Sequence, residues 1–176
     1  MNKIILASNN PNKLIEFRAI FKNHKIISLS ELGFNQDIAE TGSTLEENAL
    51  IKVREIFKIT NSTCISDDTG LEVDALNGAP GVFSARYAGE PSNAQKNIKK
   101  LLTEMDGFSD RKARFRTVIA YKDYNQELLF DGIVKGSIAL KSKGVSGFGY
   151  DPIFIPDDYQ LTFAEMSIDI KNKISH

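Results

Sequence analysis

The feature that most constrains the fold is a short apolar run, Ile-Ile-Leu-Ala at residues 4–7, which passes directly into the polar residues 8–11. A continuous apolar run of this length is typical of a strand buried on both faces of a sheet. Asn10 can cap a helix, and Pro11 suits the first helical position because no amide donor is needed there. Apolar residues then recur at helical spacing, namely Leu14, Phe17 and Phe21, with Ile20 beside them. The chain is therefore expected to begin with a strand, a polar loop and a helix.

Helix and strand patterns alternate through the following residues. Ser43 and Thr44 each precede a glutamate by three residues, so either can begin a second helix as part of a capping box. The apolar face of that helix comprises Leu45, Ala49, Val53, Ile56 and Phe57. A short strand over residues 63–66 then runs directly into an Asp-Asp-Thr-Gly segment at residues 67–70. Ser92 is expected to cap a third helix.

The second half of the chain contains the pattern of an antiparallel hairpin. Alternating residues over 113–121 predict a long strand, and a turn at 123–126 leads into a second strand over 127–134. A last helix is expected after Ser167. Because a strand–helix–strand beginning is combined with a hairpin, we predict a mixed sheet in an α/β fold.

Composition is that of an ordinary globular domain. Of the 176 residues, 41% are hydrophobic and 26% are charged, so residues 1–176 are expected to form a single domain. The net charge of −1 provides no general field for binding nucleic acid or an anionic membrane. The single cysteine, Cys64, excludes an intramolecular disulfide and is interpreted as a small buried hydrophobe. No apolar run resembles a signal peptide or approaches the ~20 residues of a membrane span, so a cytoplasmic location is expected.

Residues 8–13, Ser-Asn-Asn-Pro-Asn-Lys, have the features of a phosphate-binding loop. A loop that leads from a buried strand into a helix presents unpaired backbone amides to an anion, and the helix dipole strengthens the attraction. Lys13 adds a positive charge one turn into the helix. The glycines and the Lys-Ser/Thr pair of a Walker loop are missing. Taken alone, the segment also fits a well-capped helix with a solvated lysine.

Asp67 and Asp68 follow an apolar strand, where two carboxylates are costly unless a cation or hydrogen bonds compensate them. Ligands collect at strand ends in α/β sheets, and Mg²⁺ typically takes one or two carboxylates together with substrate phosphates. Glu40 precedes the second helix and could add a third carboxylate, although by itself it also fits the surface. The alternative interpretation of the aspartate pair is a helix cap or a turn.

Two further groups of residues are ambiguous by themselves. Asn48 and Lys52 lie four residues apart and share a helical face, which alone indicates solvated side chains. Residues 147–152 read Gly-Phe-Gly-Tyr-Asp-Pro. Either a planar base stacks on Phe148 or Tyr150 there, or the segment is a tight turn with core aromatics.

In their order along the chain and in their residues, these segments resemble the inosine/xanthosine triphosphate pyrophosphatase family, the Ham1-like nucleotide pyrophosphatases. The matching segments are Ala7-Ser8-Asn9-Asn10 with Lys13, Glu40-Thr41-Gly42, Glu47-Asn48-Ala49, Ser66-Asp67-Asp68-Thr69-Gly70-Leu71, the Gly-Ala-Pro-Gly to Ser-Ala-Arg-Tyr stretch at 78–87, Gly147-Phe148-Gly149-Tyr150-Asp151-Pro152, and Lys171-Asn172 with Ser175-His176. They span essentially the whole chain, so together they outweigh the structural alternative for each one alone.

The resemblance implies Mg²⁺-dependent hydrolysis of the nucleoside triphosphates ITP, dITP and XTP to the monophosphate and pyrophosphate. It implies that Asp68 is the general base and a metal ligand, with Glu40 a second ligand and Asp67 in support. Residues expected to bind the triphosphate are Ser8, Asn9, Asn10, Pro11, Asn12, Lys13 and Thr69. Phe148, Gly149, Tyr150 and Asp151 are expected to line the base pocket, and Lys171 and His176 to reach the purine or its phosphates. We accordingly predict a long twisted central sheet whose flanking helices form two lobes around a substrate cleft, in a homodimer.

The sequence departs from the family's pattern near its end. An arginine and a closing helix usually follow the Ser-His pair, whereas this sequence ends at His176, so the C-terminal helix is expected to be missing and base recognition to be affected. Ile170 stands where the family commonly has an acidic residue. Two alternatives stay open, namely a pyrophosphatase for other modified nucleotides and a non-catalytic nucleotide-binding module. The intact Lys13 and Asp67-Asp68 pair argue against the second.

Overall fold

The computed structural model describes residues 3–36 and 38–175. The chain forms two compact units, which we call unit 1 and unit 2. Unit 1 comprises Met1–Asp68 and Val118–Asp131, and unit 2 comprises Thr69–Thr117 and Gly132–His176. No helix within the described part of the chain is long and apolar enough to cross a membrane.

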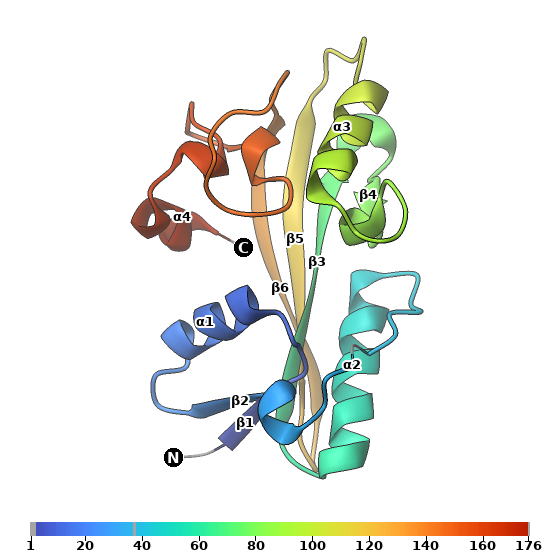
Figure 1. The fold of residues 1–176 in the computed structure, drawn as a ribbon, viewed down its shortest axis with the longest axis vertical. Coiled ribbons are helices and arrows are strands. Elements are labelled where there is room, and N and C mark those ends of the chain that lie inside the picture. Colours follow the sequence, from blue (N-terminus) through green and yellow to red (C-terminus); the bar gives the residue numbers. More distant parts are fainter. Residues whose placement is uncertain (1–2, 37, 176) are drawn as a thin grey trace. The chain divides into compact units, whose positions relative to one another are not determined.

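The elements form the mixed α/β fold that was predicted (Figure 1). The helices are α1 (Pro11–Ile20), α2 (Leu45–Thr60), α3 (Ala94–Glu104) and α4 (Ile168–Ile174). The strands are β1 (Lys3–Leu6), β2 (Lys25–Ser28), β3 (Cys64–Val73), β4 (Pro80–Gly81), β5 (Lys112–Lys122), β6 (Glu127–Ile138) and β7 (Phe154–Pro156). They follow the order β2-β1-β3-β5-β6-β7, with β4 beside β3. β1 runs parallel to β2 and β3, whereas β4 and β7 pair antiparallel, so the sheet is mixed.

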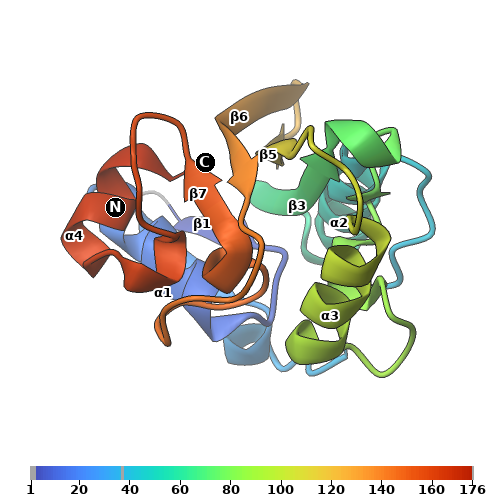
Figure 2. The same ribbon diagram turned by 90° about the horizontal axis from the view of Figure 1, so that it is seen from above.

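Unit 1 is built on two strand–helix–strand connections, β1-α1-β2 and β2-α2-β3, which run in opposite directions along the sheet because β1 lies between β2 and β3. Because such crossovers are right-handed, α1 and α2 are expected on opposite faces of the strands. Figures 1 and 2 show this arrangement, with β1 and β3 between the two helices. On the α1 face, Phe17 packs in an apolar cluster with Leu6, Ile26 and Ile65. Within unit 1, α1 therefore lies on one face of β3 and α2 on the other.

Unit 2 contains α3 and α4, which lie on opposite sides of β5 and β6 (Figures 1 and 2). Its core includes Leu101 of α3, Phe115 of β5, and the aromatic pair Phe154 and Phe163. The rings of Phe154 and Phe163 are 5.2 Å apart between centroids.

Local capping signals predict most helix starts correctly. Asn10 caps α1 and Ser167 caps α4, as predicted, and Thr44 rather than Ser43 caps α2. The predicted cap of α3 was wrong, because Asn93 accepts the hydrogen bond from Lys96 N at 2.9 Å in place of Ser92. Ser92 instead donates its hydroxyl to the carbonyl of Ala85.

Strands β3 and β6 are both longer than predicted. β3 does not stop at Ser66 but runs on through residues 67–70, so the Asp-Asp-Thr-Gly segment is neither a turn nor a helix cap. β6 extends four residues beyond the predicted end, from residue 134 to Ile138, because its last residues pair with β7. The side chains of residues 67 and 68 consequently follow strand geometry.

Candidate active site

The alternation of β3 directs Asp67 and Asp68 to opposite faces of the sheet, since successive side chains in a strand point to opposite sides. On one face, Ile65 belongs to the apolar cluster packed against α1. On the other, Cys64 Sγ donates to Val53 O at 3.2 Å and Ser66 Oγ donates to Ala49 O at 2.7 Å, both in α2. Asp67 therefore faces α1, and Asp68 faces α2.

On the α1 face, Asp67 forms an ion pair with the predicted phosphate-binding lysine. Lys13 Nζ lies 2.6 Å from Asp67 Oδ2, and the carboxylate is 5% exposed. The second oxygen, Asp67 Oδ1, is buried and accepts no hydrogen bond from the described residues. A buried carboxylate oxygen without a donor is costly, which makes it a candidate contact for a bound cation or a protonated group.

The loop before α1 has the geometry expected of an anion-binding helix start. Ser8 Oγ accepts from Asn10 N at 3.1 Å, and Asn10 Oδ1 accepts from Asn12 N at 2.9 Å. Asn9 Nδ2 donates to Gln36 O at 3.4 Å, which ties the loop to a neighbouring segment. Pro11 occupies the first turn of the helix. These contacts hold the loop in a single shape beside Lys13.

On the α2 face, Asp68 is held by two side chains of that helix. Lys52 Nζ lies 3.1 Å from Asp68 Oδ1, and Asn48 Nδ2 donates to Asp68 Oδ2 at 3.2 Å. Lys52 Nζ also lies 2.7 Å from Glu40 Oε1, so one ammonium group bridges two carboxylates. Gly42 N donates to Asn48 Oδ1 at 2.8 Å and fixes the orientation of that amide.

The charges in this group shift each other's ionisation. Burial raises the pKa of Asp68; Lys52 opposes this rise and the negative charge of Glu40 adds to it. Burial lowers the pKa of Lys52, but the carboxylates of Asp68 and Glu40 outweigh burial and hold it above its usual value. Lys52 is therefore an ammonium at neutral pH. Asp68 accepts a proton more readily than an ordinary aspartate.

Asn48 and Lys52 were predicted to be solvated when considered by themselves, and that prediction was wrong. Asn48 is 0% and Lys52 6% exposed. The overlooked signal is their register, because positions 48 and 52 interleave with the apolar residues at 45, 49, 53 and 56 and so belong to the buried stripe of α2. Polar residues inside such a stripe are buried only when they have partners, and here the partners are carboxylates.

The acidic residues fit a divalent metal only in part. Across residues 3–36 and 38–175, no group of three or more His, Cys, Asp or Glu side chains is arranged to hold a metal ion. Glu40 and Asp68 converge on Lys52, whereas Asp67 points to the other face of β3. Carboxylate oxygens are the donors that Mg²⁺ takes, and the unpaired Asp67 Oδ1 is a further oxygen donor.

Unit 2 gathers the residues that were predicted to bind the base. Lys171 Nζ lies 2.6 Å from Asp151 Oδ2, and both side chains are buried. The same carboxylate oxygen accepts from Phe148 N at 2.8 Å. The ammonium of Lys171 lies 4.9 Å from the centre of the Phe148 ring, which is half exposed. This arrangement presents an aromatic face beside a held cation.

The other predicted residues of unit 2 have structural partners. Tyr150 is buried and its hydroxyl donates to Ser84 O at 2.9 Å, so it is a core residue and not an exposed stacking platform. Thr69 Oγ1 and Thr117 Oγ1 are 2.7 Å apart and share a hydrogen bond. Gly149 has a positive φ of 57°. His176, the last predicted residue of the base site, lies outside the described residues.

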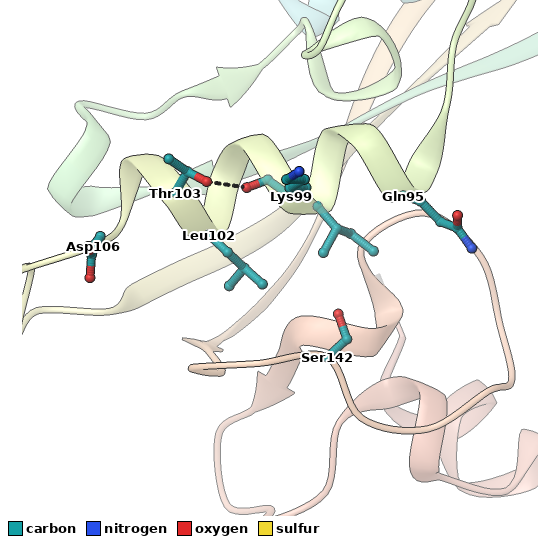
Figure 3. Close-up of a pocket in the computed structure, with 7 residues that line it drawn as sticks. Gln95, Lys99, Leu102, Thr103, Asp106 and Ser142 are labelled. Carbon is teal, nitrogen blue, oxygen red and sulfur yellow. Dashed lines mark hydrogen bonds between the residues drawn. The ribbon is translucent and has the colours of Figure 1, made fainter.

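A surface depression of about 580 Å³ on unit 2 involves none of the predicted site residues. Figure 3 shows its lining side chains along one side of α3, with Ser142 opposite them. The lining residues are Gln95, Ile98, Lys99, Leu102, Thr103, Asp106 and Ser142. The chemistry predicted from the sequence is therefore concentrated elsewhere.

Comparison with known proteins supports the resemblance noted in the sequence. The profile of the Ham1 family matches residues 4–176. The dITP/XTP pyrophosphatase of Porphyromonas gingivalis is 51% identical over 178 residues, covering 100% of this chain and 92% of the relative. That of Flavobacterium psychrophilum is 49% identical over 175 residues, covering 99% and 92%. Each of these names describes the relative.

Solved structures agree in fold. The Ham1 protein of Staphylococcus aureus matches with a TM-score of 0.93 and 45% identity, covering 99% of this chain and 92% of that one. A HAM1 protein from Coxiella burnetii also matches with a TM-score of 0.93, at 43% identity, covering 100% and 92%. The sequence profile, the relatives and the structures all point to one assignment: the chain belongs to the Ham1 family.

Proposed function

We propose that this chain hydrolyses non-canonical purine nucleoside triphosphates, namely ITP, dITP and XTP, to the nucleoside monophosphate and pyrophosphate. One structural observation carries the proposal, namely the buried Asp68 held by Lys52 and Asn48. It lies one residue along β3 from the Asp67–Lys13 pair at the start of α1. The proposed general base and the partner of the proposed phosphate-binding lysine are thus adjacent residues of one strand. Relatives that are about half identical over the whole chain carry the name dITP/XTP pyrophosphatase.

The loop before α1 is proposed to bind the triphosphate. Its helix start offers backbone amides, and the dipole of α1 favours negative charge there. Lys13 already pairs with a carboxylate, so its ammonium is held in place before any phosphate arrives. We assign Ser8, Asn9, Asn10, Pro11, Asn12 and Lys13 to phosphate binding, with Thr69 as a further contact.

Asp68 is proposed to act as the general base. Burial raises its pKa, which increases its affinity for the proton of an attacking water. The water oxygen forms a bond to the α-phosphorus, the bond from that phosphorus to the bridging oxygen breaks, and pyrophosphate leaves. Asn48 keeps the carboxylate oriented during this step.

We propose that Mg²⁺ is the cofactor, bound by Glu40 and Asp68, whereas Asp67, on the other face of β3, supports the site through Lys13. When bound, Mg²⁺ neutralises phosphate oxygens and helps to orient water. The oxygen-only donor set of these carboxylates suits a hard cation.

The purine base is assigned to residues of unit 2. Lys171 is a donor held by Asp151, and such a donor can donate to the 6-carbonyl oxygen of hypoxanthine or xanthine but not to the 6-amino group of adenine. A buried donor left unpaired costs about 1–3 kcal/mol, which disfavours adenine, whereas guanine carries the same 6-carbonyl and is not excluded by this contact. Phe148 is proposed to stack on the base, with Gly149, Tyr150 and His176 contributing to the site.

We further propose that the enzyme is a cytoplasmic homodimer. In unit 1 the side chains of Leu128 and Phe130, which share one face of β6, are 39% and 54% exposed, and Tyr124 in the preceding turn is 67% exposed. Neighbouring exposed apolar residues of this kind mark interaction surfaces. Light scattering on the purified chain, before and after Phe130→Lys, tests the dimer, and a monomeric wild-type chain would contradict it.

Pyrophosphate release tests the activity directly. Equal concentrations of dITP, XTP, dGTP and dATP are compared with and without Mg²⁺. We expect release from dITP and XTP only in the presence of metal, with much slower release from dGTP and dATP. Equal rates on the four nucleotides would rule out the proposed selectivity, and binding of dITP without release would indicate a nucleotide-binding module.

A further inference from the structure

The ammonium group of Lys52 lies between the two carboxylates that are proposed to hold the metal. Its Nζ is 2.7 Å from Glu40 Oε1 and 3.1 Å from Asp68 Oδ1, and only 8% of the side chain is exposed. Asp68 is buried and Glu40 is partly buried, so the two carboxylates repel each other unless a positive charge lies between them. In this structure Lys52 supplies that charge.

Other hydrogen bonds that orient Asp68 do not involve Lys52. Asp68 Oδ2 accepts from Asn48 Nδ2 at 3.2 Å, and Asn48 Oδ1 accepts from Gly42 N at 2.8 Å. A side chain at position 42 would collide with this amide, because a Cβ there would lie 2.8 Å from Asn48 Oδ1. Asp68 therefore stays oriented when the flexible four-carbon stem of Lys52 moves away.

We propose that Lys52 is a resident cation, which neutralises Glu40 and Asp68 until a divalent metal displaces it from between them. The proposal rests on the proposed function, since that function assigns the metal to these two carboxylates. Free metal then binds weakly, because it has to remove an ammonium group from its two partners. Metal that arrives with a triphosphate binds more readily, because the triphosphate adds negative charge to the site.

Calorimetric titration with Mn²⁺ in the absence of nucleotide tests the proposal. Lys52→Met is compared with the wild type and with Lys58→Met, which removes an exposed lysine of the same helix. Lys52→Met is expected to bind Mn²⁺ about tenfold tighter than the wild type, a typical size for coupling between two bound groups. Lys58→Met is expected to match the wild type. Mn²⁺ binding by Lys52→Met that is equal to or weaker than that of the wild type would overturn the proposal.

Three further measurements locate the effect and guard against loss of folding. Adding Glu40→Gln to Lys52→Met is expected to abolish the gain in Mn²⁺ affinity, because one of the two carboxylates is then neutral. Lys52→Gln keeps a polar side chain without the charge and is expected to gain affinity in the same direction. For both single variants, Mn²⁺ is expected to raise the melting temperature more than it does for the wild type. An equal or smaller rise in either folded variant would contradict the proposal.

Failure of this inference can be told apart from failure of the proposed function. Pyrophosphate release from dITP by the wild type tests the function alone. Tighter Mn²⁺ binding by Lys52→Met, without release by the wild type, would overturn only the function. Release by the wild type, without any gain in Mn²⁺ affinity, would overturn only the role of Lys52.

Discussion

Replacing Asp68 with asparagine removes the proposed base while changing the shape of the side chain very little. The two carboxylate oxygens accept from Lys52 and from Asn48, at 3.1 Å and 3.2 Å. An asparagine has one oxygen, so its amide nitrogen must face one of these donors. Asn48 cannot turn its own oxygen towards it without losing the hydrogen bond from Gly42 N at 2.8 Å. The variant therefore loses one buried hydrogen bond.

The effect on stability is expected to be modest. An unpaired buried donor costs about 1–3 kcal/mol, but burial already disfavours the ionised form of Asp68, and the neutral amide relieves that cost. We therefore expect a net loss of about 1–2 kcal/mol and a melting temperature lower by roughly 2–8 °C. Because domains are stable by about 5–15 kcal/mol, the variant remains folded at 25 °C.

The effect on turnover is expected to be much larger. Removing a general base typically lowers the rate by about 10²–10⁴-fold. The assay is pyrophosphate release from dITP with saturating Mg²⁺, combined with a circular dichroism melt of the same sample. Asp157→Asn, an exposed aspartate of unit 2, serves as the matched control. If Asp68→Asn keeps more than about a tenth of the wild-type kcat, Asp68 is not the base.

Three further predictions test the surroundings of the site. Thr44→Ala removes the cap of α2 and should lower the free energy of unfolding by about 0.5–2 kcal/mol, measured by urea denaturation; an unchanged midpoint would contradict the role of the cap. Gly147→Ala, at a φ of 78° and with a Cβ 2.1 Å from Asp151 Oδ2, should disturb the pair with Lys171 and raise KM for dITP by roughly tenfold; an unchanged KM would argue against this loop as the base site. Burial raises the pKa of Cys64 to about 12, so at pH 8 only ~1 thiol in 10⁴ is ionised and reaction with a disulfide reagent should be slow until the protein is unfolded in urea; rapid reaction of the native protein would contradict it.

Local signals were the part of the fold that the sequence predicted well. Asn10 and Pro11 define the start of α1 because capping depends on residues within one turn of each other. The short apolar run at residues 4–7 predicted a buried strand, and β1 does pair on both sides, with β2 and with β3. The alternation over 113–121 likewise predicted β5 closely. Each of these patterns needs no knowledge of distant residues.

Burial of polar residues could not be predicted in this way, because it depends on partners far away in the chain. Asn48 and Lys52 contact Asp68, which lies 20 and 16 residues further on. Their spacing was recognised, but it fits a solvated face equally well when no partner is known. The Ham1-like resemblance supplied the order of the segments without supplying these contacts.

The adjacent aspartates show why sequence neighbours need not share a site. They were predicted to act as one acidic cluster at a strand end, yet β3 continues to Val73, so no strand end lies there to let both carboxylates turn to the same side. Within a strand the alternation is strict, and each aspartate meets a lysine from the helix on its own face. We therefore expect Asp67→Asn to act through Lys13 and the phosphates, and so to raise KM more than it lowers kcat. Asp68→Asn should lower kcat, because Asp68 is the proposed base and shares the proposed metal site with Glu40.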